Sequence, residues 1–321
     1  MAKIKIGVIG AGNMGRNHIR LVSEMVNDFE FKGVYDPAHE RLKTVEIYNP
    51  TVFKTVESLM DSVDAVIIAA PSSLHLEIAL KAAKHGLHAL VEKPLALTAS
   101  DASIISDAYS NTGKVLMVGH IERFNPVVAE LQKIVKDEHI VAINMTRCSP
   151  KDKRISDADV IQDLMIHDID ILVNALNPAS ATAVFANGRI EYSKKFLDYA
   201  QSLLTFDNGV VASITASRIT EEKIREIAIH ARRCLVRADL LSKTLLITRS
   251  TSYKLDTGYT PTYRQENVME RIFIPSNEPL RMELSHFAEC IRTGKTPITS
   301  AESAVRSLIV LEKISKAAYS I

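Results

Sequence analysis

The order of apolar and polar positions changes character along the chain. In the first third, short apolar runs alternate with stretches in which apolar residues recur every three or four positions. A short continuous apolar run predicts a strand buried on both faces, and the longer period predicts an amphipathic helix. Alternating strands and helices indicate a doubly wound parallel sheet of the α/β class. The predicted strands are 4–9, 31–35, 64–70, 87–91 and 114–118, and the predicted helices are about 15–27, 75–85 and 99–111.

This alternation ends after residue 118. Strand-rich sequence follows in the second half, with a hairpin signal, Asp207-Asn208-Gly209, between two runs of alternating polarity. We therefore expect two domains, 1–120 and 121–321, the second an α+β domain with a largely antiparallel open sheet. Its predicted strands are 140–146, 199–206, 210–217, 223–231, 233–238 and 244–248, and its predicted helices are 127–135, 159–176, 280–292 and from 300 onward.

The first predicted strand ends in a glycine-rich turn of the form G-x-G-x-x-G. In such a turn one glycine allows the tight bend, the second lets a pyrophosphate approach the backbone, and the third lets the helix pack closely on the strand. Glycines can also mark an ordinary turn, but here they follow a predicted strand and open a predicted helix. The candidate cofactor-binding residues of this turn are Gly10, Gly12, Asn13, Met14 and Gly15.

Two further positions at the same predicted sheet edge suit a dinucleotide. Asp36 ends the second predicted strand, at the spacing where a Rossmann unit places the acid that binds the adenosine ribose. A carboxylate there repels a 2′-phosphate, so the sequence favours NAD over NADP; alternatively, Asp36 opens a turn before Pro37. Pro71 and Ser72 end the third predicted strand and are predicted to contact the cofactor, although Ser72 also suits a helix N-cap.

Composition excludes several classes of protein. The chain has 321 residues, with 39 basic and 38 acidic, so it shows no electrostatic footprint for nucleic acid or an anionic membrane. Its three cysteines are far apart, which argues against a disulfide framework or a zinc site. No apolar run is long enough to span a bilayer, and the N-terminus runs directly into the first predicted strand. We expect a cytoplasmic protein.

Two more motifs carry a resemblance to a known family. Glu92-Lys93-Pro94 follows the predicted strand at 87–91, and Asp163 and His167 form a D-x-x-x-H pattern in the second predicted domain. Together with the glycine turn, these residues make the chain resemble the glucose-fructose oxidoreductase / inositol dehydrogenase (Gfo/Idh/MocA) family of NAD(P)-dependent sugar dehydrogenases. The resemblance implies that 1–120 is an NAD-binding Rossmann domain, that Glu92 and Lys93 lie at the cofactor, and that 121–321 binds substrate and forms oligomers.

The chemistry of these motifs suits hydride transfer. Pro94 prevents a helical continuation after Lys93, so the ammonium group is aimed from the strand end and can stabilise a developing alkoxide. An imidazole beside a carboxylate is an oriented base, so His167 is predicted to accept the hydroxyl proton and Asp163 to orient it. The alternatives are a surface lysine and a histidine satisfied in the core. We expect no metal, because two candidate ligands without a third are thin support for one.

Three arginines are candidates for the substrate. Arg123 lies in the polar stretch near residue 120, and Arg147 and Arg154 flank a cationic loop that could clamp a diphosphate. Alternatively, Arg123 pairs with Glu122 at the domain junction. The stretch G-H-I-E-R-F-N-P is similar to that of the subgroup that oxidises UDP-N-acetylglucosamine at the 3-hydroxyl. The resemblance also implies a homodimer or homotetramer.

The sequence thus predicts an NAD-dependent oxidoreductase that converts a sugar hydroxyl into a ketone, with UDP-N-acetylglucosamine as the first candidate substrate. A free polyol or aldose such as myo-inositol would use the same motifs, and it would gain little from Arg147 and Arg154. A third possibility is a non-catalytic NAD sensor. Such a protein needs only the glycines and Asp36, so the presence of Lys93, Asp163 and His167 together argues against it.

Overall fold

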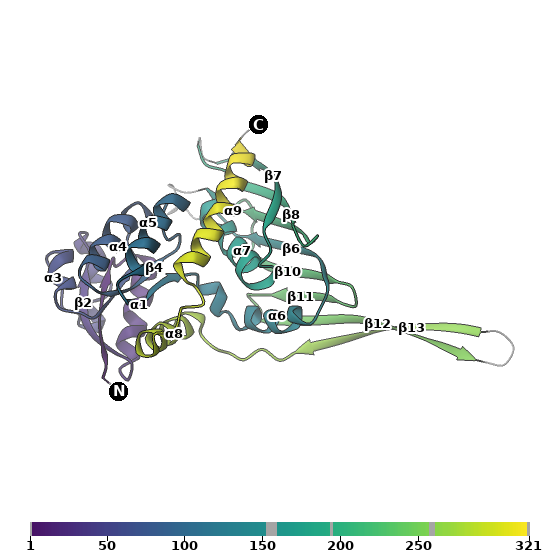
Figure 1. Ribbon diagram of the computed structural model, residues 1–321, viewed down its shortest axis with the longest axis horizontal. Coiled ribbons are helices and arrows are strands. Elements are labelled where there is room, and N and C mark those ends of the chain that lie inside the picture. The colour runs from purple at the N-terminus through teal and green to yellow at the C-terminus, as the bar shows by residue number, and fades with distance from the viewer. Residues whose placement is uncertain (1, 152–158, 193–194, 257–260, 320–321) are drawn as a thin grey trace. The chain divides into compact units, whose positions relative to one another are not determined.

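The computed structural model describes residues 2–151, 159–192, 195–256 and 261–319 (Figure 1). Contacts within the chain divide it into two compact units: Met1–Phe124 with Asn277–Ile309, and Asn125–Ser276 with Val310–Ile321. The predicted boundary at residue 120 lies close to the first of these divisions. The sequence did not predict that 277–309 return to the first unit, because an apolar helix stripe does not specify which core it joins.

A five-stranded sheet forms the centre of the first unit, in the order β2-β1-β3-β4-β5, and each neighbouring pair is parallel. The predicted α/β class and doubly wound parallel sheet are therefore confirmed. The strands are β1 (Ile4–Ile9), β2 (Phe29–Tyr35), β3 (Ala65–Ile68), β4 (His88–Glu92) and β5 (Leu116–Gly119). The helices are α1 (Asn13–Glu24), α2 (His39–Lys43), α3 (Val56–Met60), α4 (His75–Lys84), α5 (Ala99–Ser110) and α8 (Pro279–Thr293), with short helical turns η1 (Glu46–Tyr48), η2 (Ser72–Leu74) and η3 (Ile121–Phe124).

Apolar burial explains these elements. Every residue of β3 is buried, as a parallel strand covered on both faces requires. Helix α1 contributes Ile19 and Val22 to the core, and α8 contributes Leu284 and Phe287 to the same core. The site residues of the first unit are thus carried by strand ends and helix starts that a continuous apolar core holds in place.

The second unit is built on an eight-stranded sheet, in the order β13-β12-β11-β10-β6-β9-β8-β7. The pair β6–β9 is parallel and the remaining pairs are antiparallel, which confirms the predicted largely antiparallel sheet. Figure 1 shows β12 and β13 as a long hairpin that extends beyond the other strands. The strands are β6 (Ile140–Cys148), β7 (Ala181–Arg189), β8 (Tyr199–Phe206), β9 (Val211–Ser217), β10 (Ile224–Ala231), β11 (Leu235–Asp239), β12 (Thr244–Asp256) and β13 (Pro261–Ile272).

The predicted helix at 159–176 is helical but not uniformly α. Two π-helical turns, η4 (Ile161–Met165) and η5 (Leu172–Leu176), flank the α-helical α7 (Ile166–Ile171). π-helical turns are rare and are frequent at functional sites. The remaining helices are α6 (Pro126–Lys136), in the second unit, and α9 (Ala301–Tyr319), which belongs to the first unit up to Ile309 and to the second unit from Val310.

Among the residues that the structure describes, every helix is too short or too polar to cross a lipid bilayer.

Candidate active site

The glycine turn after β1 has the geometry that a dinucleotide requires. Gly10 has φ +100°, and a Cβ there would lie 2.5 Å from the carbonyl oxygen of Ala69. A Cβ at Gly15 would lie 2.0 Å from the carbonyl oxygen of Gly10, so only glycine lets α1 pack this closely on the strand. At Gly12, the N-cap of α1, no described atom lies within 4 Å of the Cβ position. The turn therefore leaves open space at a helix N-terminus, where backbone N–H groups bind phosphates.

Asp36 fixes this turn from the end of β2. Its Oδ2 accepts a hydrogen bond from the Ala11 N–H at 2.7 Å, and its Oδ1 accepts one from the Ala38 N–H at 2.8 Å. The bond to Ala38 closes a turn, so the alternative turn role of Asp36 is present in the structure. The guanidinium of Arg41 lies 3.8 Å from the Asp36 carboxylate. Contact with a ribose stays a prediction.

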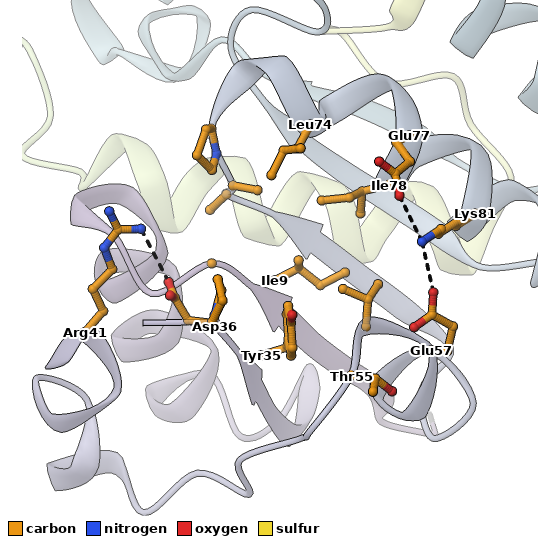
Figure 2. A pocket seen from close by; sticks show the side chains of 16 residues that line it. Ile9, Tyr35, Asp36, Arg41, Thr55, Glu57, Leu74, Glu77, Ile78 and Lys81 are labelled. Carbon is orange, nitrogen blue, oxygen red and sulfur yellow. Dashed lines mark hydrogen bonds and ion pairs between the residues drawn. The ribbon is translucent and has the colours of Figure 1, made fainter. Parts of the chain in front are cut away.

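A pocket of about 390 Å³ lies at the carboxyl ends of β1, β2 and β3. This is the edge at which open parallel sheets hold their ligands. Gly10, Asp36 and Pro71 line it, while Ser72 does not. Figure 2 shows Asp36 and Arg41 at one end of the pocket, and Lys81 with two glutamates at the other. The Asp36 carboxylate fits the adenosine part of a dinucleotide, and the open glycine turn fits its pyrophosphate.

At the far end of the pocket, one lysine pairs with two glutamates. The Lys81 ammonium lies 3.0 Å from the carboxylates of both Glu57 on α3 and Glu77 on its own helix, α4. The hydrogen bond that Lys81 donates to Glu57 is the main cause that raises the pKa of Lys81, and it also lowers the pKa of Glu57. This group joins α3 to α4 beside the pocket, and the sequence analysis did not predict it.

Lys93 follows the end of β4 and is half-buried. The preceding Glu92 is buried, and its Oε1 lies 2.7 Å from the Nε2 of His18 on α1. Burial acts to raise the pKa of Glu92, but the hydrogen bond and charge of His18, together with Lys93, lower it on balance. Glu92 thus faces His18 inside the first unit, and its predicted contact with the cofactor stays a prediction.

Asp163 and His167 are both half-buried in the second unit. Asp163 lies in η4 and His167 in α7, so the helix geometry changes between them. Asp170, three residues after His167, is buried and accepts a hydrogen bond from the Asn174 side chain at 2.8 Å. The predicted helix at 159–176 assumed uniform α-helical spacing, and the π-helical turn alters that spacing.

The predicted arginines have different surroundings. Arg147 is 2 % exposed and forms a two-pronged pair with Asp168, its Nε and Nη2 each 2.9 Å from a carboxylate oxygen. This geometry argues against the predicted diphosphate contact, because that edge of the guanidinium already binds a carboxylate. Arg123 is buried with Glu122 in η3. Arg154 lies outside the described residues.

Sequence reasoning missed two buried histidines near Lys93: His18 and His75. His18 lies on the apolar stripe of α1 beside Ile19, and His75 is the first residue of α4. The available signal was weak, since a polar residue within an apolar stripe indicates a buried partner without naming it.

Two family models match the chain. The model described as the oxidoreductase family with an NAD-binding Rossmann fold matches residues 4–120, and the Gfo/Idh/MocA C-terminal domain model matches residues 133–236.

Two curated relatives are similar over most of their length. A UDP-N-acetylglucosamine 3-dehydrogenase of Acidithiobacillus ferrooxidans is 33% identical over 250 residues, which cover 77% of each chain. A scyllo-inositol 2-dehydrogenase (NAD(+)) of Bacillus subtilis is 27% identical over 330 residues, which cover 96% of this chain and 92% of the relative.

Solved structures agree in fold. A structure of the Acidithiobacillus ferrooxidans UDP-N-acetylglucosamine 3-dehydrogenase matches with a TM-score of 0.88 and 29% identity, covering 99% of this chain and 98% of that one. A levoglucosan dehydrogenase in complex with NADH and levoglucosan matches with a TM-score of 0.82 at 21% identity, covering 99% and 97%, which shows the fold alone. The chain therefore belongs to the Gfo/Idh/MocA family of oxidoreductases, and its N-terminal part is the NAD-binding Rossmann domain of that family.

Proposed function

We propose that this protein oxidises the 3-hydroxyl of UDP-N-acetylglucosamine to a ketone, with NAD as the hydride acceptor. The observation that carries this proposal is the likeness to a UDP-N-acetylglucosamine 3-dehydrogenase, at 33% identity over 77% of both chains. The E-K-P and D-x-x-x-H residues supply the groups that the reaction needs. The product of this oxidation is a keto sugar nucleotide. Such a ketone is a substrate for transamination to an amino sugar.

Each residue has one role in the proposed reaction. When bound, NAD would supply the acceptor for the hydride that leaves the carbon bearing the reacting hydroxyl. His167 takes the hydroxyl proton, and Asp163 orients His167. Lys93 donates a hydrogen bond to the reacting oxygen and stabilises its negative charge as the carbon–hydrogen bond breaks. The pocket beside Asp36 would hold the adenosine, and the turn at Gly12 would hold the pyrophosphate.

Recognition of the substrate diphosphate is assigned to Arg123 and Arg154 rather than to Arg147. Arg147 is committed to Asp168 inside the second unit, and removal of its side chain would leave a buried carboxylate without its partner. A loss of activity on mutation of Arg147 would therefore report on folding as well as on the substrate.

A second candidate substrate is an inositol. The scyllo-inositol 2-dehydrogenase of Bacillus subtilis is less identical, at 27%, but the similarity covers 96% of this chain. An inositol carries no diphosphate, so the two substrates make different demands on Arg123.

The test is the appearance of NADH when the purified protein is mixed with NAD and UDP-N-acetylglucosamine, UDP-glucose, myo-inositol or scyllo-inositol. We expect turnover with UDP-N-acetylglucosamine. Lys93→Ala and His167→Ala should each lower kcat by about a hundredfold or more, because a positioned proton acceptor or donor contributes that much. The matched control is Lys84→Ala, which removes an exposed lysine of α4.

The other outcomes are distinct. NADH formed only with an inositol would replace the proposed substrate by the second candidate. Tight NAD binding in calorimetry without turnover of any sugar would support the sensor. Full activity in both Lys93→Ala and His167→Ala would refute the assigned chemistry.

A further inference from the structure

The two residues that flank Lys93 are both held by buried histidines from helices on the sheet. We propose that His18 and His75 are positioning residues that fix the backbone of Lys93, and thereby the place of its ammonium group. The inference rests on the proposed function, in which Lys93 contacts the reacting oxygen. Neither histidine touches substrate or cofactor in this proposal, because both act through the peptide units around Lys93.

His18 acts from the side that precedes Lys93. Its ring is fully buried in α1, with Nε2 2.7 Å from the Oε1 of Glu92. The other oxygen of Glu92, Oε2, accepts the backbone N–H of Lys93 at 3.3 Å. A continuous chain of hydrogen bonds thus runs from α1, through the Glu92 carboxylate, to the peptide unit that starts Lys93.

His75 acts from the side that follows Lys93. Its ring is 1 % exposed at the start of α4, with Nδ1 2.8 Å from the carbonyl oxygen of Pro94 and Nε2 2.9 Å from the carbonyl oxygen of Ala70. Ala70 follows β3 and lines the pocket beside Gly10. His75 therefore joins the segment after Lys93 to the strand end that borders the cofactor pocket.

The number of hydrogen bonds that the His75 ring donates depends on its protonation. A carbonyl oxygen only accepts hydrogen bonds, and a neutral imidazole has a single N–H, so both bonds form together only when the ring carries two protons. On balance the pKa of His75 is lowered, because burial outweighs the carbonyls of Pro94 and Ala70 and the charge of Glu92, which act to raise it. Glu92 thus acts on both histidines. It accepts a hydrogen bond from His18, and its charge favours the doubly protonated ring of His75.

Positioning of this kind has a large effect on rate. A displacement of about 1 Å in a catalytic group can cost on the order of a hundredfold in turnover. Lys93 has a long side chain, so the position of its ammonium group depends on how firmly its peptide units are held. Hydrogen bonds on both sides of the residue restrict that backbone.

A double-mutant cycle separates positioning from general folding. His75→Phe removes the hydrogen-bonding nitrogens of the ring and keeps the ring volume, and His18→Leu removes the donor to Glu92. Each should lower kcat by about tenfold or more in the wild-type background, with the Kd for NAD within about twofold of wild type. In a Lys93→Ala background the same substitutions should change the residual kcat by less than about twofold, because a residue that acts through Lys93 has nothing left to position. Equal losses in both backgrounds would overturn the inference.

Conservative variants guard against a failure to fold. His18→Gln and His75→Gln each keep one side-chain N–H donor, so they should recover part of the lost kcat. His85→Phe is the matched control, since His85 lies at the other end of α4 with Nδ1 bonded to the Lys81 carbonyl of the same helix. It should leave kcat unchanged. Recovery in neither Gln variant would overturn the inference.

A second readout needs no substrate. The rate at which trinitrobenzenesulfonate modifies Lys93, followed by mass spectrometry of its peptide, should rise several-fold in His75→Phe and His18→Leu and stay unchanged in His85→Phe. Unchanged Lys93 labelling in both variants would reject the positioning role even if no sugar is turned over. Conversely, an active Lys93→Ala variant would reject the proposed function while the labelling result could still stand.

Discussion

Asp36 is predicted to bind the ligand, and the structure shows that its side chain also serves the fold. Its two carboxylate oxygens accept the N–H groups of Ala11 and Ala38, so the residue holds the glycine turn in place. The sequence predicted a carboxylate at the ribose, and the structure adds that the same carboxylate is nearly buried. Loss of Asp36 therefore removes a support of the turn as well as a charge.

Substitution of Asp36 separates these two roles. Asp36→Ala should weaken NAD binding by about tenfold or more, because a buried N–H loses its acceptor and a charge-assisted hydrogen bond is lost. Asp36→Asn keeps one acceptor, so it should retain more NAD affinity while binding NADP better, since Arg41 then meets a 2′-phosphate without competition from the carboxylate. The measurement is calorimetric Kd for NAD and NADP, with Arg41→Ala as the companion variant. An unchanged ratio of the Kd values for NAD and NADP in Asp36→Asn would show that Asp36 does not bind the ribose.

Arg147 is a residue whose partner in the structure differs from the one that the sequence predicted. In the sequence it is one of several cations near a loop, and a diphosphate contact is a reasonable prediction. The structure pairs it with Asp168, 21 positions later, where both groups are buried. Buried charges are paired because an unpaired charge is costly away from water, but the sequence does not name the partner.

The strands of the first unit were predictable as elements because their pattern is local. A strand covered on both faces needs a continuous apolar run, and β3 and β5 are buried at every position. The π-helical turns around α7 were not predictable, because apolar spacing over five residues does not distinguish them from an α-helix. The polar end of β12 and all of β13 were missed, because their sequence lacks the regular alternation of apolar and polar residues that predicts a strand.

A hydrogen bond between the His88 side chain of β4 and the backbone just before β5 should make the stability of the first unit depend on pH. The Nδ1 of His88 accepts the Val115 N–H at 2.9 Å, which requires a neutral ring. Burial, with a contribution from the charge of Lys114, lowers the pKa of His88 from 6.5 to about 4. As the pH falls, His88 therefore binds a proton in the unfolded chain before it does so in the folded protein. The stabilisation from His88 is complete above about pH 6.5 and is lost as the pH falls through about 4.

The variant that tests this is His88→Asn, whose side-chain oxygen can still accept the Val115 N–H but does not titrate. Between about pH 6.5 and about pH 4, the urea midpoint of the wild-type protein should fall more steeply than that of His88→Asn. Parallel curves would show that His88 is not the group that titrates.

At the scale of the whole chain, the return of residues 277–309 to the first unit completes the core of that unit. Helix α8 brings Leu284 and Phe287 into the same core as β1, and ion pairs of Arg20 with Glu278 and of Arg281 with Glu24 join it to α1. The same helix brings a glutamate, Glu283, fully into the interior.

Glu283 is an unusual core residue. Neither of its carboxyl oxygens has a hydrogen-bond partner among the described residues, and burial together with the charge of Glu92 raises its pKa well above the ordinary value. The folded protein therefore retains a proton that the unfolded chain releases. Glu283 stabilises the fold at low pH, and this contribution is lost as the pH rises above the ordinary value of 4.5 toward the raised pKa.

Glu283→Gln removes this titration. From about pH 5 to about pH 8, the free energy of unfolding of the wild-type protein should fall relative to that of Glu283→Gln by up to about 1.4 kcal/mol for each pH unit. The comparison uses slopes from urea unfolding, because the amide itself changes stability by a constant amount. Glu289→Gln, on the same helix and exposed, is the control and should follow the wild-type curve. Equal slopes of unfolding free energy against pH in all three proteins would show that Glu283 is not the group that retains the proton.

By itself the sequence determined the parallel sheet, the glycine turn with its NAD preference, the antiparallel sheet and the family motifs, because each is a local pattern of spacing and residue type. Only the tertiary structure decided which side chains meet. It joined His18 to Glu92 across 74 positions, His75 to Pro94, Arg147 to Asp168, and α8 to the first core. Contacts of this kind follow from the packing of whole elements, since a buried polar group accepts whichever partner the packed core presents to it.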